Sequence, residues 1–166
     1  MGFRLKVDGD SKIEFKEDVL TQVQFLSNTP NGGQAKGKGR DGLDLKDVDY
    51  GATAGSGNAR ATDVGMGVKI WGRINFSLGA EIEDSTVTMA NWSLQSSDQA
   101  AAYRKAVVQV VASGQVVREY TFPNAFIVEY SEDLDDEEGV GHFYLHLRQK
   151  KDLNPKVELK GGFEVS

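Results

Sequence analysis

The stretch that decides the fold is Val64-Gly65-Met66-Gly67-Val68-Lys69-Ile70-Trp71-Gly72-Arg73-Ile74-Asn75-Phe76-Ser77-Leu78. Even-numbered positions carry apolar residues and Gly72, and odd-numbered positions carry Gly65, Gly67, Trp71 and the polar and charged residues. Alternation with a period of two predicts a long strand with one buried face. The glycines within it indicate bends or close backbone approach, as at the corner of a barrel.

Other segments share this β character. Ser113-Gly114 separates two runs rich in β-branched residues, 106–111 and 115–122, and this arrangement predicts a hairpin. Pro123-Asn124 is expected to interrupt the strand, which resumes at 125–130. Further strands are expected at Phe3–Val7, Val19–Leu26, Val140–Arg148 and Lys156–Lys160.

A single helix is expected after Asp84 or Ser85, either of which can cap it, because Val87, Ala90 and Leu94 recur at helical spacing. A second helical turn is expected at 98–103. The sequence therefore predicts a mainly β fold: a closed or nearly closed β-barrel or sandwich with one flanking α-helix and a long glycine-rich loop. With 166 residues, the chain suits a single domain over 1–166.

The glycine-rich loop is the segment 28–60, where residues 31–60 hold eight of the chain's 19 glycines. Long loops without periodicity are usually functional or disordered. We interpret this one as an extended arm that becomes ordered against a neighbouring molecule, and the alternative is a surface loop without a partner. Its mixed charges suit docking by charge pairing, and the candidate contact residues are Lys36, Lys38, Arg40, Asp41, Asp44, Asp47 and Asp49.

Composition excludes several classes of protein. The chain has no cysteine, which removes disulfides, thiol nucleophiles and cysteine-ligated metals. The net charge of −6 argues against a protein held on nucleic acid by phosphate contacts. No stretch approaches 18 apolar residues, so no membrane anchor is expected, and Met1–Lys6 lacks the apolar core of a secretory signal. The expected location is therefore the cytoplasm.

Motifs for catalysis are incomplete. The segment Gly32–Gly39 fits seven positions of a phosphate-binding loop, but Gly39 stands where a magnesium-holding Ser or Thr is required. His142 and His146 share one face of a strand about 13 Å apart, too far to hold one metal ion. There is no His-Glu-x-x-His or Gly-x-Ser-x-Gly pattern. We therefore expect no enzyme, no cofactor and no metal site.

Two groups of residues have structural interpretations. The acidic run 132–138 lacks the ligand order of a calcium loop, so we expect a solvated turn between strands. The residues of this run expected to make an outer contact are Glu132, Asp133, Asp135 and Asp136. The aromatic residues are expected to pack in the core and at interfaces.

Several motifs resemble known families. Asn58–Val64, Ala90–Leu94, Val117–Phe126 and Arg148–Asp152 resemble a Firmicutes family often labelled "membrane-associated protease", over about residues 58–163. The sequence has neither a membrane segment nor a protease signature, so the activity in that label is not carried over. The order of elements is also similar to the Hcp-like tube proteins of type VI secretion, phage tails and related contractile injection systems.

The second resemblance implies a structural protein and virion component. Such subunits form hexameric rings that stack into a hollow tail tube, with sheath, baseplate and tape-measure or cargo proteins as partners, and DNA passing through if the particle is a phage tail. Assembly is then expected in the cytoplasm. The polar face of the strand 64–78 would line the lumen through Lys69, Arg73 and Asn75.

Two alternatives remain open. A monomeric β-barrel that binds a small ligand or a peptide predicts a stoichiometric ligand and no assembly. A peptidase predicts turnover of a peptide substrate that is lost when Ser93, Ser131 or a histidine is changed.

Overall fold

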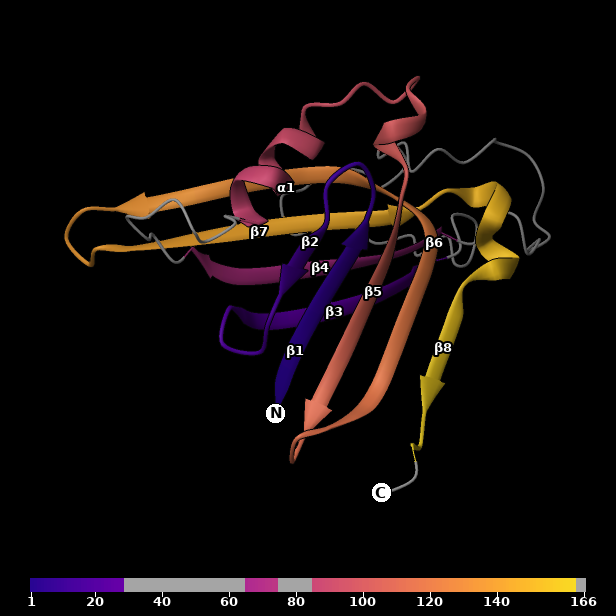
Figure 1. Cartoon of the computed structure of the whole chain (residues 1–166), viewed down its shortest axis with the longest axis horizontal. Coiled ribbons are helices and arrows are strands. Elements are labelled where there is room, and N and C mark those ends of the chain that lie inside the picture. The colour runs from indigo at the N-terminus through magenta and orange to yellow at the C-terminus, as the bar shows by residue number, and fades with distance from the viewer. Residues whose placement is uncertain (29–64, 75–84, 164–166) are drawn as a thin grey trace, which may run out of the picture.

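The computed structural model describes residues 1–28, 65–74 and 85–163, and these residues form a mainly β structure with one α-helix (Figure 1). The strands are β1 (Gly2–Asp8), β2 (Ile13–Phe15), β3 (Leu20–Asn28), β4 (Gly65–Ile74), β5 (Arg104–Ala112), β6 (Gln115–Asp135), β7 (Val140–Gln149) and β8 (Glu158–Gly161). The helical elements are α1 (Ser85–Ser93) and the 3-10 turns η3 (Ala100–Ala102) and η4 (Lys151–Lys156).

The strands form a single antiparallel sheet in the order β2-β1-β5-β6-β7-β4-β3, with β8 beside β6. Its two ends, β2 and β3, are joined by only the four residues 16–19. The sheet therefore curls until its ends approach each other without pairing across the gap in the described part of the chain. Figure 1 shows the result as two sets of strands that cross, with the long β6 bending from one set into the other. The expected mainly β, nearly closed architecture is confirmed.

The alternating stretch forms β4, as predicted. Val68, Ile70 and Ile74 are buried, Lys69 is half-buried and Arg73 is exposed. Residues 75–78, the end of the predicted strand, lie outside the described residues. The structure also contains the three-residue β2, which the sequence analysis missed because so short a run carries no readable periodicity.

The predicted hairpin is the β5–β6 hairpin. Its turn residues Ser113 and Gly114 have φ of 51° and 76°, as a tight two-residue turn requires. The expected interruption at Pro123 is wrong, because β6 continues from Gln115 to Asp135. A register shift between Arg104 and Ala106 of β5 lies opposite this point, and such a shift accommodates a residue that lacks an N–H group.

Helix α1 is present, but its apolar spacing does not mark the buried side. The buried residues are Thr86, Met89 and Trp92, whereas Val87 and Leu94 are 55% and 82% exposed. The reason is that α1 is fixed to two strands, to β2 through Ser85 and Glu14 and to β6 through Thr86 and Tyr130. These contacts, rather than the apolar residues, decide which side of the helix is buried. Of the two predicted caps, Asp84 lies outside the described residues.

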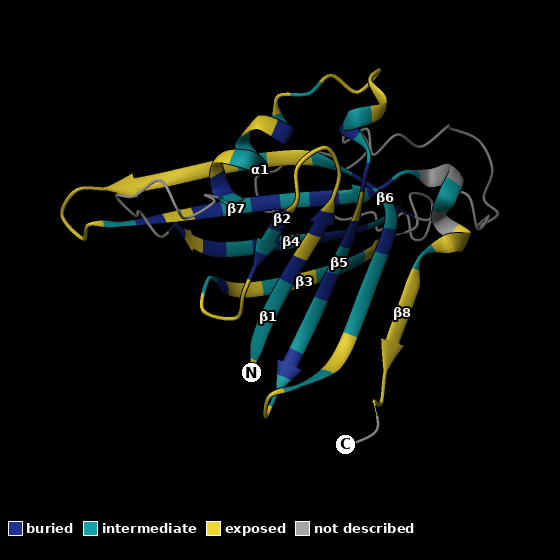
Figure 2. Ribbon diagram, viewed as in Figure 1, coloured by how far each residue is buried: buried dark blue, intermediate teal, exposed yellow. Residues whose placement is uncertain are grey.

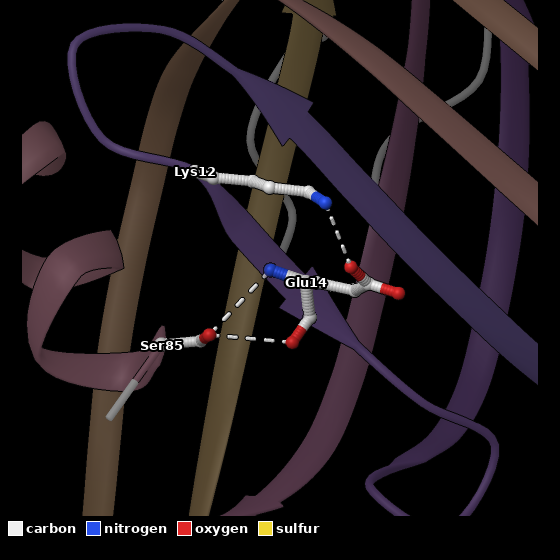
Figure 3. A network of polar contacts seen from close by, with 3 residues as sticks. All are labelled: Lys12, Glu14 and Ser85. Atoms are coloured by element: carbon white, nitrogen blue, oxygen red, sulfur yellow. Dashed lines mark hydrogen bonds and ion pairs between the residues drawn. The ribbon is translucent and has the colours of Figure 1, made fainter. Parts of the chain in front are cut away.

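The other predicted cap, Ser85, fixes the start of α1 to the edge of β2 (Figure 3). Its hydroxyl donates to the carbonyl oxygen of Glu14 at 3.2 Å and accepts a longer contact from the Glu14 N–H at 3.5 Å. Glu14 is also paired with Lys12, with 3.3 Å between Nζ and Oε2. On the opposite side, the Tyr130 hydroxyl of β6 contacts the carbonyl oxygen of Thr86 at 3.4 Å.

The core lies between the two sets of strands (Figure 2). One side supplies Leu5, Val7, Ile13, Ala106 and Val108, and the other supplies Val68, Ile70, Phe143, Leu145 and Leu147. Aromatic packing is prominent, since Phe15 stacks on Phe143 with 5.1 Å between ring centroids. Burial of side chains of this size supplies the main stabilisation of the fold, at about 1.5–3 kcal/mol each.

Trp92 anchors the end of α1 to the start of β5. Its indole N–H donates to the carbonyl oxygen of Ala102 at 2.9 Å, and the Arg104 guanidinium lies 5.2 Å from its ring centroid. Burial lowers the pKa of Arg104, and the nearby Asp10 acts in the opposite direction. The second helical turn expected at 98–103 is η3, which ends at Ala102.

Candidate assembly interface

Polar and aromatic side chains cover the outer face of strands β3, β4, β7 and β6, the side turned away from the core. The strand register places its side chains in three cross-strand rows. One row consists of Gln24, Lys69, His146 and Glu129; the next of Gln22, Trp71, Tyr144 and Ser131; the third of Arg73, His142 and Asp133. The first and third rows each carry a cation on β4, Lys69 or Arg73, and a carboxylate on β6, Glu129 or Asp133, with a histidine of β7 between them.

The first row has a definite electrostatic character. Burial lowers the pKa of His146, the neighbouring Lys69 and Arg148 lower it further, and Glu129 acts in the opposite direction. His146 is therefore neutral at pH 7, and its protonation would place a third positive charge between two existing ones. The two cations beside His146 therefore favour the neutral imidazole.

The middle row is aromatic. The Trp71 and Tyr144 rings are 5.2 Å apart at their centroids and tilted by 43°. Burial raises the pKa of Tyr144, and Glu129 raises it further. Trp71 and Tyr144 are only half-buried, so they form a rigid platform that another surface can cover.

The predicted lumen residues lie partly on this face. Lys69 and Arg73 both point away from the core, four residues apart on β4. Asn75 lies outside the described residues, as do the predicted arm residues within 28–60. The structure thus brings two predicted positions onto one face, beside His142 and His146, which share that face as expected.

The predicted acidic turn closes the β6–β7 hairpin. Residues 132–138 are exposed, and Asp135 accepts from the Glu137 N–H at 2.9 Å through its side chain. Gly139, with a φ of 64°, completes the turn and donates its N–H to the carbonyl oxygen of Asp135 at 3.1 Å. Leu134 is 64% exposed among these carboxylates. The expected exposed position between two strands is confirmed, but the turn is shorter than predicted, because 132–135 are the last residues of β6 and only 136–139 form the turn.

The residues named for a peptidase are not cross-strand neighbours of the histidines. Ser131 lies opposite Tyr144, whereas His142 and His146 lie opposite Asp133 and Glu129. In α1, the Ser93 hydroxyl donates to the carbonyl oxygen of Ala90. Within the described ranges, no three His, Asp or Glu side chains gather where they could hold a metal ion. None of the described helices is long and apolar enough to cross a membrane.

A charged hollow of about 340 Å³ lies over β1 and β2. It is lined by Arg4, Lys6, Glu14, Lys16, Glu17 and Asp18. Arg4 and Glu17 form an ion pair across it. Since three of these side chains are cationic and three are anionic, the hollow is suited to polar contacts rather than to an apolar ligand.

The sequence analysis missed a second cluster, at the end of β7 remote from the acidic turn. The Tyr103 and Phe126 rings meet edge to face at 5.9 Å and 67°, and Lys150 Nζ lies 4.8 Å from the Tyr103 ring centroid. Arg148 lies opposite Phe126 in the register. These residues come from β6, from β7 and the residue after it, and from the segment before β5, so no local motif could have indicated the cluster.

No protein-family model and no curated protein sequence matches the chain. Its structure is similar to a chain of the anti-feeding prophage baseplate, a six-fold symmetrised assembly, with a TM-score of 0.50, 10% identity and coverage of 96% of this chain and 93% of that one. Hcp1 from Flavobacterium johnsoniae matches with a TM-score of 0.46, 14% identity and coverage of 98% and 97%. The sheath–tube complex of PVC, an extracellular contractile injection system, matches with a TM-score of 0.46, 11% identity and coverage of 97% and 89%.

The structural neighbours are thus Hcp1 and components of contractile injection particles, and the likeness to the baseplate chain is one of fold. It extends over almost the whole of both chains. The expected similarity in architecture is therefore confirmed in part, as a fold shared with the baseplate chain. The resemblance to the Firmicutes family stays a prediction.

Proposed function

We propose that the chain is a structural inner-tube protomer without catalytic activity. It would assemble into hexameric rings that stack into the hollow tube of a phage tail or contractile injection system. The observation that carries the proposal is the shared fold, along almost the entire chain, with a component of a six-fold baseplate. Strands β3 and β8, each paired on one side only in the described part of the chain, support it, because such edges can extend a sheet between subunits.

In this proposal, residues 1–166 are a single tube-type domain and 28–60 is its arm. The arm would bind an adjacent ring through its mixed charges. The outer face of β4 would line the lumen through Lys69, Arg73 and Asn75. A polar wall there would let cargo pass without binding to the tube through apolar contacts. The half-buried Lys69 and exposed Arg73 suit that position.

The partners follow from this role. They are further copies of the chain, then the sheath, the baseplate and a tape-measure or cargo protein, with DNA as the passenger in a phage tail. The acidic turn would serve as an outer contact through Glu132, Asp133, Asp135 and Asp136. Assembly would take place in the cytoplasm before the particle is complete.

Light scattering over a concentration series of the purified chain tests the proposal. Rings would give a particle six times the 18.1 kDa protomer mass, about 109 kDa, or larger stacks. A particle of protomer mass at every concentration would contradict it. Such a monomer with a stoichiometric ligand would favour a ligand-binding barrel, and peptide turnover lost with Ser93, Ser131 or a histidine would favour a peptidase.

A further inference from the structure

The two ends of the β6–β7 hairpin carry opposite charges. One end is the acidic tip, residues 132–138, which includes six carboxylates with the exposed Leu134 among them. The hairpin carries this tip away from the rest of the sheet (Figures 1 and 2). The tip therefore consists of one exposed apolar side chain surrounded by carboxylates, at the end of a hydrogen-bonded hairpin.

The opposite end carries a basic aromatic patch, which consists of Tyr103, Phe126, Arg148 and Lys150. All four are half-buried. The two rings meet edge to face, and Lys150 lies over Tyr103. Arg148 lies opposite Phe126 in the strand register, so it stands beside the two rings. The patch is thus an aromatic centre flanked by two cations.

Tip and patch cannot meet within one chain. Leu134 and Phe126 are eight residues apart on the same strand, which corresponds to about 26 Å at 3.3 Å per residue. The continuous register between β6 and β7, interrupted by one bulge near Val128, keeps this hairpin extended. Any contact between the two surfaces therefore joins different molecules.

The surfaces match in chemistry. Leu134 offers an apolar anchor to the exposed parts of the two rings, and the surrounding carboxylates face Arg148 and Lys150. Opposite charges around an apolar centre guide association and fix its orientation. Because the two surfaces lie at opposite ends of one hairpin, the contact is head-to-tail, the type that closes a ring or propagates a stack.

We propose that the acidic tip of one copy docks on the basic aromatic patch of the next copy. This inference rests on the proposed self-assembly and names the partner of the outer contact. The turn between β6 and β7 is thereby assigned to a contact between copies of the chain.

The test uses charge reversal in the full chain. The tip variant changes Asp133, Asp136, Glu137 and Glu138 to Lys, which leaves four lysines against two carboxylates and keeps Asp135, the side-chain acceptor of the turn. The patch variant is Arg148→Glu with Lys150→Glu. Alone, each variant brings like charges together at every contact, and we expect its dissociation constant to rise at least tenfold in sedimentation velocity. Mixed in equal amounts they alternate, so each tip again meets a patch of opposite charge, and association recovers.

A chain that carries all six changes is the matched control. It has a basic tip and an acidic patch, so it associates like the wild type, and thermal unfolding checks that each variant is folded. If the reversed variants associate as the wild type does, or if neither the mixture nor the six-fold variant recovers, the contact is overturned while the proposed function stands. A wild-type chain that stays monomeric overturns both.

Discussion

Gly72 offers a sharp test of how closely the side chains pack where β4 pairs with β7. It lies opposite Phe143 in the register of β4 and β7, on the side of β4 that faces the core. A Cβ atom here would lie 2.5 Å from Cζ of Phe143, closer still to Cε1, and 3.0 Å from the carbonyl oxygen of Val19. Real Cβ atoms do not approach other atoms this closely, so Gly72→Ala must displace the ring or the backbone.

The magnitude follows from two opposing effects. Overpacking of this kind costs about 1–3 kcal/mol. Replacing glycine returns about 0.5–1 kcal/mol, because the unfolded chain loses freedom. We therefore expect Gly72→Ala to lower the free energy of unfolding by about 1–2 kcal/mol, which moves a urea midpoint by roughly 0.5–1 M for an m-value of ~2 kcal/mol/M.

The assay is urea unfolding followed by tryptophan fluorescence, with Gly161→Ala as control. At Gly161 the nearest atom to a new Cβ is the Val117 carbonyl oxygen at 3.8 Å, an ordinary contact, so Gly161→Ala should leave stability unchanged or raise it by up to about 1 kcal/mol. Combining Gly72→Ala with Phe143→Leu should recover about 1 kcal/mol relative to the sum of the single effects. Equal effects at Gly72 and Gly161, or strict additivity with Phe143→Leu, would refute the reasoning.

Four further predictions concern the helix anchor, the outer face and the arm. Burial and neighbouring cations lower the pKa of His146 in the folded chain, so the free energy of unfolding should fall as the pH drops below about 6.5. In urea unfolding at pH 7.5 and pH 5, His146→Gln should lose less stability between the two pH values than the wild type does. An identical loss would contradict the assignment. Trp92→Phe removes the donor to the Ala102 carbonyl and should cost about 1–3 kcal/mol in the same assay, whereas no loss would show that the anchor is dispensable. Deletion of 32–56 should leave the barrel folded by circular dichroism but prevent tube growth, and long tubes from the deleted chain would refute the arm. In assembled tubes, Arg73→Cys should resist a bulky thiol reagent that cannot enter the bore, and rapid labelling of subunits in the middle of the tube would exclude a lumen position.

Strands with one buried face could be predicted from the alternation of apolar and polar residues in their own sequence. The β4 alternation and the Ser113-Gly114 turn required only the chemistry of neighbouring residues, and both are present. The continuity of β6 through Pro123 could not be read locally, because the register shift that accommodates the proline involves β5. The buried side of α1 was hidden for a similar reason, since Thr86 faces the core while Val87 faces outward.

The same limit applies to the candidate surfaces. The acidic turn is contiguous in sequence, so its position between two strands was predictable. The row of Lys69, His146 and Glu129 and the patch around Tyr103 each combine residues from distant segments. Only strand register brings them together, and register depends on the whole sheet.

Negative-stain electron microscopy of the concentrated protein tests the central claim most directly. A tube protomer should give rings with a central opening, or hollow rods built from stacked rings. A field of compact particles of protomer size, at concentrations where the light-scattering mass is also 18.1 kDa, would contradict the account.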